Sequence, residues 1–359
     1  MNTETLPFHN YRTDSALIFL MYALLLVPFL FLSLKIKPFQ NVSELPKGDF
    51  FNFLLIFLAI GILFSLVYLT PYAIKALSEN ASDFRVCLKD EESLPPTYLT
   101  TLAVGFPTFY YIYVFFFYVC IIQKKSLLIT TIMLLGIVAF IVNVFTAAGR
   151  DGVFLAFFAL LIGYFLFEPL LSQKRKKVFK MSFIIFSLIG MAFILKITTD
   201  RFAINGHFNF QAFKNGVISY LGMQPFIFSD WINYNKLFNH GNSEFKLFVD
   251  LAGVSTSTLY EYNTDPYMWN FGTFLTSFYS VSGFFSLFTL ASVFWLYFKL
   301  MLNKIRQYYV LSNLFLLSFY FHFIVTGVFY FRLGTSGGNI FMLLCIIAVY
   351  LLRKKIVFK

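Results

Sequence analysis

Residues 127–167 read LLITTIMLLGIVAFIVNVFTAAGRDGVFLAFFALLIGYFLF, and this stretch decides the fold class. Two apolar runs, each close to the roughly 20 residues that a helix needs to cross a bilayer, are separated by a short turn that carries Arg150 and Asp151. Because lipid offers no hydrogen-bond partners, the backbone groups of such a run must be paired within a helix. The segment therefore predicts two membrane-spanning helices joined by a hairpin turn.

The same pattern recurs along the whole chain. Of its 359 residues, 59% are hydrophobic and 21% aromatic, which is more apolar side chain than a soluble core of this size can bury. Nine apolar runs can be read, over residues 15–34, 51–70, 97–122, 127–147, 153–171, 179–197, 271–298, 308–331 and 337–352. The runs 97–122 and 271–298 are long enough to tilt. We predict an all-α, polytopic membrane bundle of nine to ten spans, forming one domain over residues 1–359.

The distribution of charge predicts how the bundle is oriented. Loops 35–50, 123–126, 172–180 and 299–307 and the tail from residue 353 hold 17 of the 28 Lys and Arg residues, and with Glu168 at an adjoining helix end they account for three of the 17 acidic residues. By the positive-inside rule this set faces the cytoplasm, with the N-terminus outside and the C-terminus inside. The net charge of +11 is spread over short loops, so we expect no nucleic-acid partner.

The longest non-spanning stretch, residues 196–270, falls on the opposite, extracytoplasmic side. It is too aromatic for a disordered linker and is expected to fold against the membrane surface. Within it, NGVISYLGMQPFIFSDWI (215–232) is apolar, is broken by Gly222 and Pro225, and suits an interfacial or re-entrant helix. A tenth span at this position is the alternative.

Arginine and lysine are divided differently between the two sides. Fourteen of the 20 lysines fall on the predicted cytoplasmic side, but five of the eight arginines fall outside: Arg12, Arg85, Arg150, Arg201 and Arg332. A guanidinium fork matches phosphate bidentately, so arginines at the outer ends of spans suit a lipid-linked phosphate or pyrophosphate. The alternative is pairing with neighbouring acids or lipid headgroups. We take Arg150, Arg201 and Arg332 as candidate substrate-binding residues, with Asp151 capping its helix or orienting the Arg150 guanidinium.

Proton transfer requires a base, and the sequence offers three main candidates: His207, Asp230 and His322. His322 lies inside an apolar run, where it acts either in function or as a hydrogen bonder between helices. The runs contain no Asp or Glu pair, and the chain has neither a P-loop nor an HExxH motif, which disfavours proton-driven and ATP-driven transport. Cys87, Cys120 and Cys345 are far apart, so we expect no disulfide, metal or cofactor.

Several of these stretches resemble the bacterial O-antigen polymerase, or oligosaccharide repeat unit polymerase (Wzy-type), family. The resemblance covers roughly residues 130–300 and rests on these motifs: AAGRDGVF between two spans, DRF at 200–202 opening the large loop, YLGMQPFIFSDW within it and WNFGTFLTSFYSVSGFFSLF at 269–288. It implies a GT-C-like glycosyltransferase in the bacterial inner membrane that joins polyprenyl-pyrophosphate-linked oligosaccharides as donor and acceptor. It also implies that Arg150 and Arg201 hold the donor pyrophosphate, and a regulator of chain length is a possible partner.

Three other functions remain open from the sequence. A ligase that moves finished glycan to lipid A or protein has nearly the same donor chemistry. A flippase or exporter of lipid-linked glycan requires polar residues along a path through the bundle, whereas the runs here are mainly Phe, Leu and Ile. An acyltransferase that decorates glycans requires a histidine in or beside the spans, for which His322 is the candidate.

Overall fold

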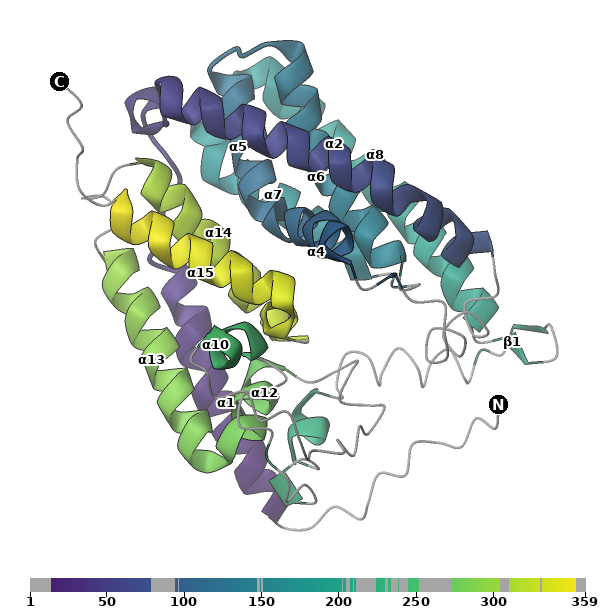
Figure 1. Ribbon diagram of the computed structural model, residues 1–359, viewed down its shortest axis with the longest axis vertical. Coiled ribbons are helices and arrows are strands. Elements are labelled where there is room, and N and C mark those ends of the chain that lie inside the picture. The colour runs from purple at the N-terminus through teal and green to yellow at the C-terminus, as the bar shows by residue number, and fades with distance from the viewer. Residues whose placement is uncertain are drawn as a thin grey trace.

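Figure 1 shows the computed structural model of the chain, a bundle in which nearly all the regular structure is helical. The structure describes residues 14–78, 94–95, 97–146, 149, 151–201, 203–204, 207–208, 210, 224–229, 232–233, 238, 245–251, 273–303, 310–329 and 331–352. Within these ranges the exception to helix is a two-residue antiparallel pairing of β1 (Ala203–Ile204) with β2 (His207–Phe208).

The long helices follow the apolar runs of the sequence. They are α1 (Asp14–Ser33), α2 (Asp49–Ser78), α4 (Tyr98–Gly105) continued by η2 (Phe106–Phe109) and α5 (Tyr110–Ile122), α6 (Leu127–Phe145), α7 (Asp151–Phe167), α8 (Gln173–Arg201), α12 (Phe274–Ser282), α13 (Phe284–Asn303), α14 (Val310–Gly327) and α15 (Ser336–Leu351). The shorter elements are η1 (Val42–Glu44), η3 (Glu168–Leu170), α10 (Lys246–Leu251) and η5 (Arg332–Gly334).

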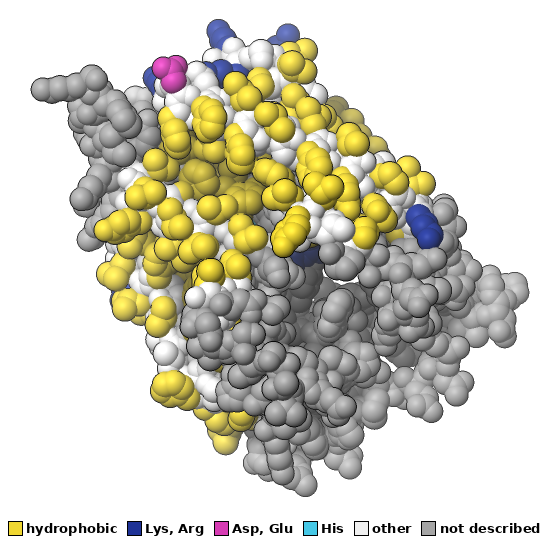
Figure 2. All heavy atoms as spheres, viewed as in Figure 1, with side chains coloured by type: hydrophobic (Ala, Val, Ile, Leu, Met, Phe, Trp, Pro, Cys, Tyr) yellow, Lys and Arg dark blue, Asp and Glu magenta, His cyan; other side chains and the backbone are white. Residues whose placement is uncertain are grey.

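The described part of the chain contains six helices long and apolar enough to cross a membrane, and α14 and α15 are shorter apolar helices. Hydrophobic side chains cover the helices on the face shown in Figure 2, while several charged side chains gather along its upper edge. An exposed apolar surface of this kind is stable in lipid and not in water. The prediction of an all-helical fold with several helices able to cross a membrane is confirmed for the described residues, and the count of nine to ten spans stays a prediction.

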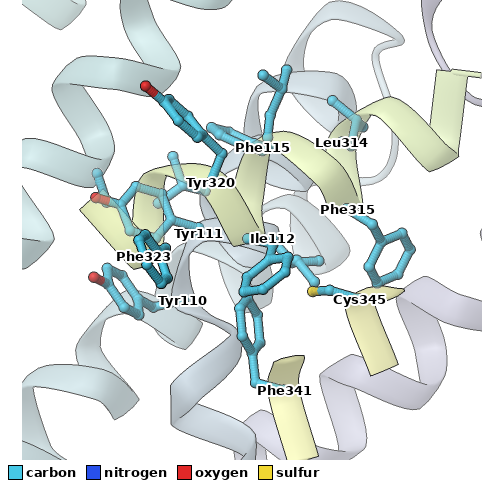
Figure 3. Packing of buried hydrophobic residues seen from close by; sticks show 14 of the residues in the cluster. Tyr110, Tyr111, Ile112, Phe115, Leu314, Phe315, Tyr320, Phe323, Phe341 and Cys345 are labelled. Atoms are coloured by element: carbon cyan, nitrogen blue, oxygen red, sulfur yellow. The ribbon is translucent and has the colours of Figure 1, made fainter. Parts of the chain in front are cut away.

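The centre of the bundle is α5, whose sequence YYIYVFFFYVCII has no polar face. A helix that is apolar all round is stable when other helices surround it, and α5 packs against α6, α7 and α14. Figure 3 shows Tyr111, Ile112 and Phe115 of this helix among the buried side chains of α14 and α15. The remaining helices form two groups, with α14 and α15 lying between α2–α8 on one side and α1, α12 and α13 on the other (Figure 1).

Residues 271–298, predicted as one long span, are instead two helices where the structure describes them. The break is at Gly283, whose φ of +73° is a conformation that a residue with a side chain adopts only under strain. The chain reverses there, because Phe278 of α12 and Phe294 of α13 have ring centroids only 5.4 Å apart although they are sixteen positions apart in the sequence. Helix α12 therefore folds back along α13 and is buried against the bundle.

One end of the bundle collects the loops that were predicted to be cytoplasmic, and we call it the lysine-rich end. Four side-chain hydrogen bonds join these loops: Lys35 to Asn303 at 2.9 Å, Gln123 to the Pro46 carbonyl at 2.7 Å, Lys125 to Asn52 at 2.7 Å and Arg175 to the Ile121 carbonyl at 2.7 Å. The opposite end, which we call the Arg332 end, holds Asp151, η5 and α10. The segments that the charge pattern assigned to one side of the membrane are thus in contact with one another.

Candidate functional site

An ion pair marks the Arg332 end. Asp151 lies in the first turn of α7, and Arg332 lies in η5, just before α15. The Arg332 Nη2 donates to Asp151 Oδ2 at 2.6 Å, and the side chains are 19% and 40% exposed. The pair joins two turns that are 181 residues apart in the sequence. The AAGRDGVF turn and the YFRLGTSGGN turn therefore form one polar locus.

The position of Arg332 is fixed from several directions. Its guanidinium carbon lies 5.1 Å from the centre of the Phe140 ring, a distance typical of a cation–π contact. Thr335 donates its hydroxyl to the Arg332 carbonyl at 2.9 Å and caps α15 by accepting from the Gly338 amide at 3.1 Å. Asn339 donates to the Leu333 carbonyl at 2.7 Å. A charge-assisted contact held this firmly is suited to recognition of an anion in one orientation.

Gly338 permits this arrangement because the backbone of η5 packs directly against the first turn of α15. A Cβ built on Gly338 comes within 2.5 Å of both the Arg332 carbonyl oxygen and the Leu333 Cα. Both of these are backbone atoms, which cannot rotate away as a side chain can. The Gly and Ser turn between the last two spans, noted in the sequence, thus serves to bring Arg332 close to α15.

A fully buried polar cluster lies beneath the ion pair. It consists of Tyr110 and Tyr111 of α5 and His322 of α14, which are at most 1% exposed. Tyr110 stacks on Phe140 with ring centroids 3.9 Å apart, and the same Phe140 ring lies under Arg332. His322 makes an edge contact with Tyr110 at 5.1 Å and lies 6.0 Å from Tyr111. These aromatic rings form the floor of the site.

His322 lacks the hydrogen bonds expected of a buried imidazole. Neither ring nitrogen makes a hydrogen bond to any residue that the structure describes. A buried polar atom without a partner costs about 1–3 kcal/mol, and sites of this kind are concentrated in functional regions. The imidazole is too deeply buried to touch a substrate at the surface of the bundle.

Two described segments of the 196–270 loop pack against the bundle. Phe245, next to α10, has its ring centroid 6.1 Å from that of Phe331, the residue before Arg332. Residues 224–229 are helical, and Phe228 within them is buried against Tyr22 of α1 with ring centroids 5.4 Å apart. Phe245 therefore packs beside η5 and Phe228 beside α1, and the predicted contact of this loop with the membrane surface stays a prediction.

No model of a known protein family, no curated protein and no solved structure matches this chain. The likeness to the polymerase family therefore rests on the motifs quoted above. No group of three or more His, Cys, Asp or Glu side chains that could hold a metal ion occurs among the described residues.

The predicted site residues fall into two groups. Asp151, Arg332 and His322 lie at or beneath the Arg332 end, where Tyr110 and Phe140 lie between the histidine and Arg332. Arg150 and Asp230 lie outside the described residues, as do the side chains of Arg201 and His207, whose backbones are described. The sequence left open whether Asp151 caps its helix or orients the Arg150 guanidinium, and in the structure its carboxylate pairs with Arg332.

Two residues of the site were missed from sequence. Tyr110 and Tyr111 belong to an apolar run that reads as a plain membrane span, in which aromatic residues usually mark the interface or fill the core. The adjacent tyrosines could have been noticed in the sequence, because each places a hydroxyl group inside an apolar run and a buried Tyr O–H normally needs a hydrogen-bond partner. Both tyrosine hydroxyl groups are buried and make no hydrogen bond to any residue that the structure describes.

Proposed function

We propose that this chain is a GT-C-like membrane glycosyltransferase that polymerises polyprenyl-pyrophosphate-linked oligosaccharide repeat units into surface polysaccharide. The observation that carries the proposal is the half-buried Arg332–Asp151 pair over an aromatic floor, at the end of the bundle opposite the lysine-rich loops. We place this end on the extracytoplasmic face of a bacterial inner membrane, with the N-terminus outside and the C-terminus cytoplasmic. The positive-inside rule supports that orientation.

The reaction transfers the growing glycan from its lipid to a new repeat unit. A hydroxyl oxygen of the acceptor sugar attacks the anomeric carbon of the donor, the bond from that carbon to the pyrophosphate oxygen breaks, and the hydroxyl proton passes to a base. Polyprenyl pyrophosphate leaves with increased negative charge. No ATP is present on the extracytoplasmic face, so the energy comes from the pyrophosphate linkage of the donor.

Arg332 is the described residue best placed to stabilise that leaving charge. A guanidinium keeps its positive charge at any physiological pH and forms paired hydrogen bonds to phosphate oxygens. Asp151 orients Arg332 and shares it with the pyrophosphate when the donor binds. Both α7 and α15 begin at this locus, and the positive ends of their dipoles also favour an anion. Arg150 and Arg201 are proposed as further pyrophosphate ligands.

His322 is proposed as a positioning residue and not as the base, because it is 1% exposed beneath Tyr110 and Phe341. It supports the floor on which Arg332 rests through Tyr110 and Phe140. Asp230 and His207 of the large loop stay the candidates for the base that accepts the proton of the acceptor hydroxyl.

A glycan ligase is the second candidate, since it uses the same donor and the same leaving group. An exporter of lipid-linked glycan is less well supported, because the centre of the bundle is filled by α5. Phe115, Phe116 and Tyr113 are fully buried there, and they line no polar path through the described helices. The substrates are thus proposed to stay at the membrane surface, with a chain-length regulator as a possible partner.

The test is the length distribution of surface polysaccharide in a strain that lacks the gene and is complemented with variants. Wild type restores a ladder of long chains, whereas Arg332→Ala leaves single repeats although the variant reaches the membrane in equal amount. Lys177→Ala, an exposed lysine of α8 at the lysine-rich end, is the matched control and restores the ladder. Long chains in the deletion strain would contradict the polymerase proposal.

A purified assay separates polymerase from ligase. The full chain in vesicles is supplied with lipid-linked repeat units and no other acceptor. A polymerase extends these units into a ladder that is still attached to the polyprenyl lipid. A ligase consumes the donor only after lipid A or an acceptor protein is added, and that result would replace the first proposal by the second.

A further inference from the structure

A groove runs along the outer surface of the bundle between α1 and α13, remote from the Arg332 end. Its volume is about 460 Å³, within the roughly 300–1,000 Å³ of typical ligand sites. Its lining consists of Ala23, Leu24, Val27, Pro28, Phe31, Leu32, Lys35, Trp295 and Lys299. Helices α1 and α13 are the least buried of the six candidate spans, so the groove faces the lipid.

The shape of the groove follows from the sizes of its side chains. Ala23 and Pro28 are small and leave a hollow on α1, while Leu24 and Phe31 stand beside it, 64% and 62% exposed. Trp295 of α13 contributes the facing wall. The hollow is long, narrow and apolar, which matches an acyl chain better than a compact polar molecule.

Two lysines give the groove a cationic end. The Lys299 ammonium lies 4.4 Å from the centre of the Trp295 ring, and the Lys35 ammonium donates to Asn303 Oδ1 at 2.9 Å. Neither ammonium is within 4.0 Å of a carboxylate oxygen in the described part of the chain. An ammonium has three donors, so each lysine keeps donors for another acceptor. The groove thus combines an apolar length with an uncompensated positive end.

We propose that this groove binds one anionic phospholipid, with an acyl chain along Leu24, Val27 and Phe31 and the phosphate between Lys35 and Lys299. A free phosphate would make no use of the apolar walls, and a zwitterionic lipid would leave the two positive charges uncompensated. The lipid belongs to the leaflet at the lysine-rich end. The bound lipid fills the groove between α1 and α13. This inference does not depend on the glycosyltransferase proposal.

Trp295 provides a direct probe, because it lines the groove and the chain has three tryptophans. Trp231→Phe and Trp269→Phe leave Trp295 as the single fluorophore in the full chain. The protein is placed in vesicles of phosphatidylcholine that contain either brominated phosphatidylglycerol or brominated phosphatidylcholine, whose bromine atoms quench fluorescence on contact. We expect the anionic lipid to quench at a mole fraction on the order of tenfold lower, the preference expected from two lysines near an anionic headgroup.

The double variant Lys35→Gln with Lys299→Gln tests the cationic end. In this variant both brominated lipids should quench Trp295 at the same mole fraction. Lys177→Gln, at an exposed lysine elsewhere at the same end, should keep the preference for phosphatidylglycerol. Equal quenching by both lipids in the parent protein, or a preference that survives the double variant, would overturn the proposal. An equal effect of Lys177→Gln would also overturn it, because the preference would then reflect general surface charge.

Native mass spectrometry of the chain with all three tryptophans gives an independent measurement. Protein taken from an equal mixture of the two lipids should retain one phosphatidylglycerol, and added inorganic phosphate should not displace it. The double lysine variant should lose that lipid. Retention of both lipids in equal amounts, or displacement by inorganic phosphate, would contradict a phospholipid site. Neither measurement involves polysaccharide synthesis, so failure here is distinguishable from failure of the proposed function.

Discussion

At the lysine-rich end, Lys35, Lys125 and Arg175 each donate to a neutral oxygen near the end of another helix, whereas Arg332 at the opposite end faces a carboxylate. The first three contacts are separate, so losing one leaves the others intact. Arg332 instead combines an ion pair, a cation–π contact and a capped turn in one half-buried place. The difference teaches that the basic residues at one end make separate contacts between segments, while Arg332 at the other combines several contacts at the one place for which we propose substrate binding.

The largest expected effect comes from exchanging lysine and arginine at the two ends. Arg332→Lys keeps the charge but loses the planar fork, and we expect polymerisation to fall roughly 10- to 100-fold, as for the loss of one charge-assisted hydrogen bond of about 1.5–3 kcal/mol. Lys125→Arg should leave the rate unchanged. The effect of each substitution is measured as the rate of ladder formation by the purified variant in vesicles. Equal rates for wild type and Arg332→Lys would remove the distinction between the ends.

Glycine backbones at the two ends allow a second comparison. Gly283 and Gly48 both have positive φ, of +73° and +97°, but a Cβ on Gly283 meets the Phe238 ring at 3.0 Å and one on Gly48 meets nothing within 4 Å. Gly48→Ala should lower stability by about 1–2 kcal/mol through backbone strain, and Gly283→Ala by more. Thermal unfolding in detergent measures both changes. A smaller loss at Gly283 would argue against the reversal between α12 and α13.

The turn that carries Arg332 can be displaced without changing its charge. Gly338→Ala forces the η5 backbone away from α15, and we expect about 1–3 kcal/mol of destabilisation with loss of activity. Gly105→Ala is the control, because a Cβ there meets nothing within 4 Å and Ala favours a helix. Unfolding temperature and polymerisation rate are compared for the two variants. Full activity in Gly338→Ala would show that the position of η5 does not matter.

The smallest effect is expected from a single contact at the lysine-rich end. Lys125→Ala removes the 2.7 Å hydrogen bond to Asn52, which should lower stability by about 0.5–1.5 kcal/mol and leave activity intact. Chemical denaturation in detergent gives the stability change. An activity loss as large as that of Arg332→Ala would contradict the division of roles between the ends.

The fold was predictable where composition alone decides it. A run such as residues 127–145 must be helical in lipid, and the loops grouped by charge do touch one another at the lysine-rich end. The break at Gly283 was not predictable, because one glycine within an apolar run is usually tolerated by a helix. Only the packing of α12 on α13 shows that the chain turns back there.

Asp151, Arg332 and His322 could be named as candidate site residues from the sequence, but the contact between Asp151 and Arg332 could not be predicted. Charge and turn chemistry singled out Asp151 and Arg332 separately, but their contact depends on which helices are neighbours, and the sequence contains no such information. The pairing of α5 with α14 likewise placed Tyr110 beside His322. Each of these residues taken alone is consistent with an ordinary membrane helix.

The most direct test of the account is to reverse the ion pair with Asp151→Arg and Arg332→Asp in one chain. The reversed pair keeps both charges and their attraction but moves the cation from η5 to the start of α7. The account predicts that the double variant unfolds at nearly the wild-type temperature and more stably than either single variant, yet forms no polysaccharide ladder. A double variant that regains both stability and polymerisation would show that the pair is structural, and it would contradict the assignment of Arg332 to the substrate.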